Sequence, residues 1–223
     1  MYSKFIKRFL DIVLSGFAIV VLSPLYLIIA IIVRVQMGAP ILFSQERIGK
    51  DETVFKLYTF RSMTNEKDEN GNLLPERERL TKFGIALRST SLDELPELFM
   101  IFKGEMSFVG PRPQPIFYLP YYTEEERASH LVRGGLIPPD CLSKEVQCSW
   151  ETQFKYESYY AKNLSFFLDL KVIFCTFVVL YKRMKKNYGA DDRPMLNQYR
   201  AGKKFTDEEI RKWARLGIEI KRP

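Results

Sequence analysis

Residues 12–33, IVLSGFAIVVLSPLYLIIAIIV, decide which kind of fold this chain can adopt. They lie between Asp11 and Arg34 and form a run of 22 residues without one charged side chain. As a straight helix the run would be roughly 33 Å long, which is enough to cross a bilayer. Pro24 stands at its middle, where proline removes a backbone hydrogen bond and bends a helix, and the hydroxyl of Ser23 can satisfy part of the broken ladder. We therefore expect a membrane-embedded helix with a break at Ser23-Pro24.

The residues that flank this run are basic on both sides. An excess of positive charge marks the cytosolic side of a membrane segment, so the flanks do not indicate which end would lie outside the cytosol. The bases before the run are Lys4, Lys7 and Arg8, and those after it are Arg34, Arg47 and Lys50. A helix that enters the membrane, bends at Ser23-Pro24 and leaves through the same face would keep both flanks in the cytosol. An ordinary kinked transmembrane helix is the alternative, and the sequence leaves both open. A secretory signal is not indicated, because no small-x-small cleavage site follows the run.

The composition indicates one sizeable domain with appendages. The chain has 223 residues, of which 46% are hydrophobic, enough to bury a single core. Its formal charge of +7 and its pI near 9.2 predict an anionic partner, such as a membrane surface, a phosphorylated substrate or nucleic acid. Nucleic acid is the weakest of these, because no basic stripe with interleaved aromatic residues is apparent. The three cysteines match no zinc or redox spacing and His130 is the single histidine, which argues for a reduced, cytosol-facing protein without a histidine-based metal site.

Two adjacent carboxylates, Asp93 and Glu94, stand among leucines in the stretch RSTSLDELPELFMIFKGEMSFVGPRP, residues 88–113. Carboxylates in apolar company are costly to keep ionised unless cations or hydrogen-bond donors compensate them. The nearby bases suited to this task are Arg88, Lys103 and Arg112, the last of which is held between Pro111 and Pro113. This combination predicts a site for a metal ion and phosphate.

The same residues also fit a helix start, because Ser91-Leu92-Asp93-Glu94 has the spacing of a capping box. In this interpretation Glu94 reaches back to the amide of Ser91, and Asp93 lies near the positive end of the helix dipole. Both interpretations stay open, since a helix N-terminus also offers free amides to a phosphate.

Three further segments have readable patterns. Residues 41–61 alternate like a hairpin, with ILFSQ and TVFKLYTFR as strands around a turn at residues 49–52. The polar residues that either line a site or form a solvated strand face are Gln45, Arg47, Lys56 and Arg61. Residues 150–186 form a second apolar block, which is either an interfacial amphipathic helix or a buried core helix. Residues 205–217 predict a short helix with a capping box from Thr206 to Glu209 and a stop at Gly217.

Together these features resemble the small bacterial monotopic phosphoglycosyl transferases, the PglC-like family of bacterial sugar transferases. The resemblance covers about residues 7–182, and its most specific motifs are Lys7-Arg8-x-x-Asp11, Ser23-Pro24, Gln45-x-Arg47-x-Gly49, Phe60-Arg61-Ser62-Met63, Arg88-x-x-Ser91-Leu92-Asp93-Glu94-Leu95-Pro96, Lys103-Gly104-x-Met106-Ser107 and Gly110-Pro111-Arg112-Pro113. It implies an α+β fold, mostly helical, with a membrane-embedded re-entrant N-terminal helix, a small β-hairpin and interfacial amphipathic helices. The implied organisation is a re-entrant helix over residues 1–38, a catalytic domain over 39–187 and a tail with a short helix over 188–223.

The resemblance also implies a reaction on the cytosolic face of the bacterial inner membrane. Asp93, assisted by Glu94, would attack the β-phosphate of a UDP-sugar, release UMP and pass the phosphosugar to undecaprenyl phosphate. Mg²⁺ at these two carboxylates and nearby arginines would offset the repulsion between a carboxylate and a diphosphate. The residues expected to bind substrate phosphate are Arg88, Arg112, Arg61 and Arg133. Membrane lipid and downstream glycosyltransferases are the further expected partners.

Two departures from the family pattern stand out. The glycine-threonine turn that is common after Arg133 is replaced here by GGLIPPDCLS, residues 134–143, and Glu157 stands where an aspartate is usual. The first change could alter nucleotide or sugar recognition, so residues 134–143 receive no binding role. A divergent, non-catalytic scaffold anchored in the membrane is the alternative function, and the intact acidic pair with its neighbouring arginines argues against it.

Overall fold

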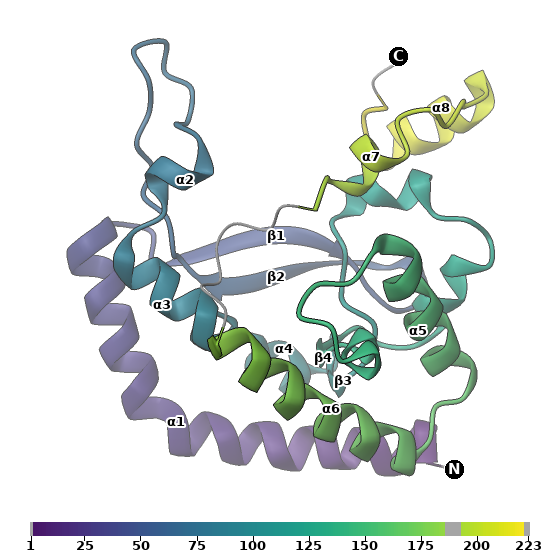
Figure 1. Ribbon diagram of the computed structural model, residues 1–223, viewed down its shortest axis with the longest axis horizontal. Coiled ribbons are helices and arrows are strands. Elements are labelled where there is room, and N and C mark those ends of the chain that lie inside the picture. Colours follow the sequence, from purple (N-terminus) through teal and green to yellow (C-terminus); the bar gives the residue numbers. More distant parts are fainter. Residues whose placement is uncertain (1, 186–192, 221–223) are drawn as a thin grey trace.

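The computed structural model describes residues 2–185 and 193–220, and it is mostly helical with two small sheets (Figure 1). The α-helices are α1 (Lys7–Met37), α2 (Glu76–Arg79), α3 (Lys82–Thr90), α4 (Glu97–Lys103), α5 (Trp150–Lys162), α6 (Phe166–Lys185), α7 (Leu196–Tyr199) and α8 (Asp207–Arg215). The strands are β1 (Leu42–Ile48), β2 (Val54–Phe60), β3 (Ser107–Val109) and β4 (Gly135–Ile137). The predicted α+β, mostly helical class is confirmed, while the domain boundary predicted between residues 187 and 188 lies outside the described residues.

Helix α1 bends near its middle (Figure 1) and contains Pro24. The hydroxyl of Ser23 donates to the carbonyl of Val20 at 2.8 Å. In an unbroken helix that carbonyl would accept from the amide of residue 24, which proline lacks. The predicted rescue of the broken ladder by Ser23 is therefore confirmed.

The apolar surface of α1 is largely uncovered. Among the described residues, α1 is the one helix long and apolar enough to cross a membrane, and only 11% of its most apolar window is buried. Its exposed side chains include Phe9, Phe17, Val20, Leu27 and Val35. A core helix of a soluble domain would bury its apolar face, so α1 has the surface expected of a helix in contact with lipid.

Three polar side chains fix the N-terminal part of α1 to the rest of the chain. Lys7 donates to the buried carboxylate of Asp169 in α6 at 2.7 Å. Arg8 donates to two carbonyls at the C-terminal end of α4, at 2.6 and 2.8 Å. The buried carboxylate of Asp11 accepts from the first two residues of β3, at 3.1 Å each. These contacts tie the helix to α6, α4 and β3 at once.

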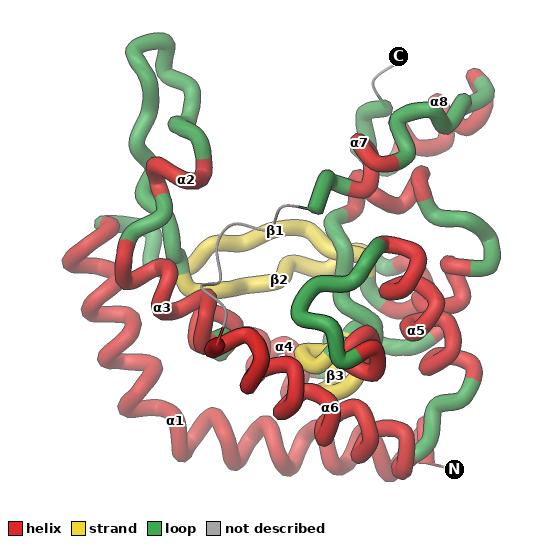
Figure 2. The backbone as a smooth tube through the Cα atoms, viewed as in Figure 1, coloured by secondary structure: helices red, strands yellow, loops and turns green. Residues whose placement is uncertain are grey.

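The hairpin lies between α1 and the C-terminal part of the fold, where the tube in Figure 2 shows its two strands as the longer yellow pair. Strands β1 and β2 pair antiparallel around a turn that contains the 3-10 segment η2 (Lys50–Glu52). Asp51 and Glu52 reverse the chain there with φ angles of 53° and 59°. The predicted hairpin is confirmed, although β1 continues to Ile48 instead of ending at Gln45.

The apolar block over residues 150–186 forms two helices instead of one. Helix α5 is a core helix, since it buries Phe154 and Tyr160. Helix α6 exposes a row of aromatic side chains, Phe167, Phe174 and Phe177. The buried interpretation therefore fits α5, and the exposed aromatic face expected of an interfacial helix is found on α6.

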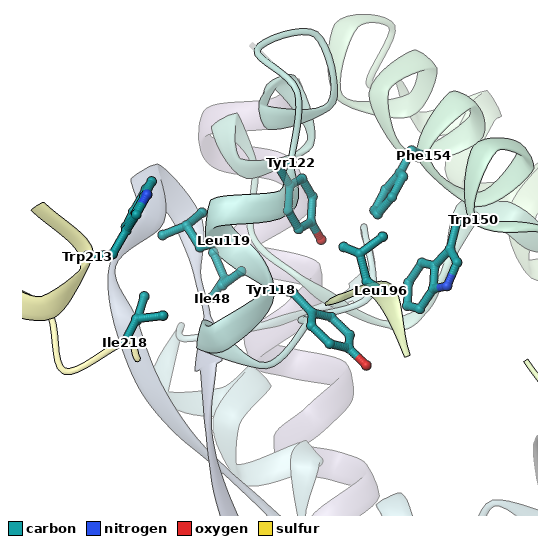
Figure 3. Close-up of a cluster of buried hydrophobic side chains, with 9 residues drawn as sticks. All are labelled: Ile48, Tyr118, Leu119, Tyr122, Trp150, Phe154, Leu196, Trp213 and Ile218. Atoms are coloured by element: carbon teal, nitrogen blue, oxygen red, sulfur yellow. The ribbon is translucent and has the colours of Figure 1, made fainter. Parts of the chain in front are cut away.

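A cluster of buried side chains joins β1, the 3-10 segment η4 (Ile116–Tyr121), α5 and the C-terminal residues (Figure 3). Its members are Ile48, Tyr118, Leu119, Tyr122, Trp150, Phe154, Leu196, Trp213 and Ile218. The capping box predicted from Thr206 to Glu209 is confirmed at the start of α8, and Gly217 follows the helix with a φ of 73°. The tail thus docks on its own chain.

Candidate active site

The acidic pair lies in a tight turn between α3 and α4. After α3, Ser91 adopts a left-handed conformation with a φ of 56°, and Asp93 and Glu94 follow in the 3-10 segment η3 (Leu92–Glu94). The predicted capping box is wrong, because Ser91 makes no side-chain cap bond and its carbonyl accepts from the Glu94 amide at 3.2 Å. Ser91 instead ends α3, and α4 begins only at Glu97. The turn leaves both carboxylates partly exposed.

This turn is tied to the bent part of α1. Tyr26, two residues after Pro24, donates its hydroxyl to the carbonyl of Leu95, the residue that follows the acidic pair. Leu95 also packs against two clusters of buried apolar side chains. It shares one cluster with Leu22 of α1 and the other with Leu25 of α1. The position of the acidic pair relative to α1 is therefore set by direct contact.

Arg112, on the loop Pro111-Arg112-Pro113, contacts the acidic pair at Glu94. Its Nη1 lies 3.5 Å from Oε1 of Glu94. The loop is held at its backbone, since the Arg112 amide donates to Oε1 of Glu157 at 3.0 Å and Nη1 of Arg47 donates to the Pro113 carbonyl at 3.1 Å. The arginine head stays half-exposed while its loop is fixed, which is the arrangement needed to bind an anion from solution.

Two glycines explain how the altered segment after Arg133 meets this loop. Strand β4 pairs parallel to β3, and the amide of Gly135 donates to the Pro111 carbonyl at 2.8 Å. A Cβ atom at Gly134 would lie 2.5 Å from Cγ of Pro113, and one at Gly135 would lie 2.0 Å from the Gly110 amide nitrogen. Residues 134 and 135 therefore lack side chains because the strand and the arginine loop touch.

A third carboxylate, Glu97, lies buried beside the acidic pair. Its own burial and the neighbouring Glu94 raise the pKa of Glu97 to about 8, although Arg112 and Arg47 act in the opposite direction. Burial and Arg112 lower the pKa of the Arg47 guanidinium to about 10. The raised pKa of Glu97 favours its neutral form, and none of the sequence predictions included this residue although it stands three residues after Glu94.

The four arginines predicted to bind phosphate have different surroundings. Arg112 contacts Glu94. Arg88, in the last turn of α3, donates Nε to the Ser62 hydroxyl at 2.9 Å. Arg61 is buried after β2, and its guanidinium donates to backbone carbonyls, among them that of Pro40 at 2.7 Å. Arg133 donates Nε to the carbonyl of Gly104 at 2.7 Å, beside α4. The structure thus brings Arg112 to Glu94 and gives Arg61 and Arg133 backbone carbonyls as partners.

The donor set at this site suits a cation that needs few protein ligands. Within residues 2–185 and 193–220, no group of three or more His, Cys, Asp or Glu side chains could hold a metal ion. Asp93 and Glu94 are two partly exposed oxygen donors. Mg²⁺ is commonly bound by one or two carboxylates together with water and substrate phosphates, so the two side chains fit this ion and not a caged metal.

Comparison with known proteins identifies the family. The profile of the bacterial sugar transferases matches residues 2–183. The uncharacterized sugar transferase EpsL of Bacillus subtilis is 42% identical over 171 residues, which are 77% of this chain and 85% of that protein.

Two larger relatives carry names that describe a reaction. The UDP-N-acetylgalactosamine-undecaprenyl-phosphate N-acetylgalactosaminephosphotransferase of Aeromonas hydrophila is 33% identical over 77% of this chain and 43% of its own length. The UDP-glucose:undecaprenyl-phosphate glucose-1-phosphate transferase of Klebsiella pneumoniae is 35% identical over 76% of this chain and 39% of its own length. This chain therefore spans less than half of these two relatives. On the extent of the family match, the chain belongs to the bacterial sugar transferase family.

Proposed function

We propose that this protein transfers a phosphosugar from a UDP-sugar to undecaprenyl phosphate and releases UMP. The names of the relatives support this reaction, since they combine a UDP-sugar donor with an undecaprenyl phosphate acceptor. The observation that carries the proposal is the acidic turn itself. In this turn Glu94, next to Asp93, lies 3.5 Å from Arg112, and the turn is held to the bent helix α1 through Tyr26 and the Leu95 carbonyl.

The reaction has two displacements at one phosphorus atom. In the first, a carboxylate oxygen of Asp93 forms a bond to the β-phosphorus of the UDP-sugar, the bond to the bridging oxygen breaks, and UMP leaves with that oxygen. In the second, a phosphate oxygen of undecaprenyl phosphate attacks the same phosphorus and restores the free carboxylate. The products are UMP and undecaprenyl diphosphate sugar, and a covalent intermediate divides one difficult transfer into two easier ones.

The neighbouring groups counter the negative charge that gathers at this site. The guanidinium of Arg112 offers forked donors to phosphate oxygens, and its fixed loop limits the entropy lost on binding. The raised pKa of Glu97 favours its neutral form, which lessens the repulsion of the anionic donor. Asp93 and Glu94 would hold Mg²⁺, which, when bound, neutralises charge on the diphosphate.

The membrane supplies the acceptor at a fixed depth. We propose that α1 is re-entrant and that the exposed aromatic face of α6, Phe167, Phe174 and Phe177, lies at headgroup level on the cytosolic face of the inner membrane. A phosphate held at the surface by its lipid tail would then meet the acidic turn, which Tyr26 connects to α1.

The nucleophile is tested by UMP release from a panel of UDP-sugars with Mg²⁺ and undecaprenyl phosphate. The protein should release UMP and form a phosphosugar adduct, and Asp93→Asn should abolish both. The matched control is Asp51→Asn, at an exposed carboxylate in the hairpin turn, which should leave UMP release unchanged. Full activity in Asp93→Asn would reject the nucleophile, and a silent wild-type protein on every donor would reject the reaction.

The topology is tested by labelling single cysteines shortly before α1 and in its last turn. Ser3 and Gln36 are exposed, whereas the native cysteines are buried and can be replaced by alanine. Ser3→Cys and Gln36→Cys should both react with a membrane-impermeant maleimide from the cytosolic side only. Labelling of either position from the periplasm would establish a span in place of a re-entrant helix.

A further inference from the structure

The C-terminal segment, residues 193–220, follows the part of the chain that matches the family, residues 2–183. Its apolar contacts with the rest of the protein are extensive, because Leu196, Trp213 and Ile218 are almost completely buried in the cluster of Figure 3. Its polar contacts include an ion pair between Arg200 and Glu126, with nitrogen–oxygen distances of 2.6 and 2.7 Å. The C-terminal segment is thus packed as part of the folded protein.

Arg193 begins this segment and contacts helix α5. Its guanidinium lies over the Trp150 ring, 3.7 Å from the ring centre. Its Nη1 donates to the carbonyl of Cys148 and to Oε1 of Gln153, at 3.0 Å each. The Trp150 ring nitrogen in turn donates to the carbonyl of Pro194 at 3.0 Å.

Gln153 connects Arg193 to Glu157, which holds the arginine loop. It is only 1% exposed, and its Nε2 donates to Oε1 of Glu157 at 2.9 Å. The same oxygen of Glu157 accepts from the Arg112 amide at 3.0 Å. Three hydrogen bonds therefore lead from the C-terminal segment to the backbone of the arginine loop.

The direction of this chain of bonds is set by chemistry. A glutamine amide has an accepting oxygen at one side and a donating nitrogen at the other. The cation of Arg193 faces the oxygen and the carboxyl of Glu157 faces the nitrogen, so each end of Gln153 has the partner that suits it. Without Arg193 the buried oxygen would lose that donor, and the amide could turn and present its oxygen to Glu157.

At the arginine loop, this chain of hydrogen bonds ends at a single backbone donor, the Arg112 amide. Neither Pro111 nor Pro113 has an amide hydrogen, so the Arg112 amide is the only backbone donor in the loop Pro111-Arg112-Pro113, and Glu157 accepts its hydrogen bond. We infer that the C-terminal segment positions Arg112 through Arg193, Gln153 and Glu157. Arg193 and Gln153 are positioning residues, since they act on the site through the loop.

The experiment combines hydrogen exchange with kinetics in the full-length protein. Arg193→Ala and Gln153→Leu should each accelerate the site-resolved hydrogen exchange of the Arg112 amide. Each should also raise KM for the UDP-sugar, by about tenfold if the binding free energy of one hydrogen bond is lost. The double variant should lose no more than either single variant, because both remove the same link. Arg193→Lys should restore part of the effect, since an ammonium group can also donate to Gln153.

The matched control is Arg200→Ala, which removes the ion pair with Glu126 from the same segment and leaves the link intact. It should keep the exchange rate of the Arg112 amide and the KM of the wild-type protein. The inference is overturned if Arg193→Ala and Gln153→Leu leave exchange unchanged, or if Arg200→Ala gives the same changes as they do.

The kinetic half of this test rests on the proposed function, and the exchange half does not. Faster exchange in a protein that releases no UMP would uphold the positioning and reject the proposed reaction. Normal UMP release with unchanged exchange would uphold the reaction and reject the positioning.

Discussion

Glu157 combines complete burial with an ionisable group, and this makes the stability of the protein depend on pH. Burial and the nearby Asp140 raise the pKa of Glu157 to about 8, although the donors from Gln153 and Arg112 act in the opposite direction. In the unfolded chain the group has the ordinary glutamate pKa of 4.5. Between these values the folded state holds one proton more than the unfolded state, so the stability that Glu157 contributes below pH 4.5 is lost as pH rises toward 8. The loss is about 1.4 kcal/mol per pH unit.

Glu157→Gln isolates this contribution, because glutamine keeps an oxygen that can accept from Arg112 and Gln153 and does not titrate. From about pH 6 to about pH 8 the wild-type protein should lose about 2 kcal/mol of unfolding free energy relative to the variant, since the slope falls as Glu157 begins to ionise in the folded state. Denaturant unfolding in detergent across this pH range, followed by tryptophan fluorescence, measures the difference. Other groups that titrate, such as Glu97, are common to both proteins and cancel.

The control for this experiment is Glu145→Gln, at an exposed carboxylate before α5. Its stability should follow that of the wild-type protein at every pH. Parallel curves for the wild-type protein and Glu157→Gln would show that Glu157 is ionised in the fold and would refute the reasoning.

Two further predictions concern packing away from the acidic turn. Lys7 and Asp169 pair at 2.7 Å with side chains only 11% and 8% exposed, so Lys7→Met or Asp169→Asn alone should cost about 3–5 kcal/mol by leaving one charge buried, and the double variant should recover much of it. Unfolding midpoints of the four proteins test this, and additive losses would contradict it. Gly84→Ala would place Cβ 1.8 Å from the carbonyl oxygen of Ser62, so overpacking should lower its unfolding free energy by about 1–3 kcal/mol and its midpoint should fall. Gly202→Ala, with open space around it, should keep the wild-type midpoint.

Sequence patterns predicted well the features that act within one turn of chain. The hydroxyl of Ser23 next to Pro24 and the cap from Thr206 to Glu209 both depend on neighbours within a few residues. The capping box predicted at Ser91 was wrong, although its spacing is equally local. Ser91 ends α3 in a left-handed conformation and therefore does not cap the next helix. Local spacing cannot decide between two helices that compete for one residue.

The partners of arginines were the least predictable part of the site. A guanidinium offers the same donors to a phosphate and to a backbone carbonyl, and only the folded chain places one or the other within reach. Arg112 reaches Glu94, whereas Arg61 and Arg133 reach carbonyls. The link from Arg193 to Glu157 joins residues far apart in the chain, and a single sequence carries no sign of it.

The bend of α1 at Pro24, where the Ser23 hydroxyl donates to the Val20 carbonyl, also bears on the bilayer thickness that suits this protein. A straight span has to match the hydrocarbon thickness of its bilayer, and the mismatch energy sorts such proteins among membranes. A helix that turns at Pro24 and returns to the face it entered has no such length to match. With α1 re-entrant as proposed, activity should be insensitive to acyl-chain length and should respond instead to lateral packing within the one leaflet that α1 occupies.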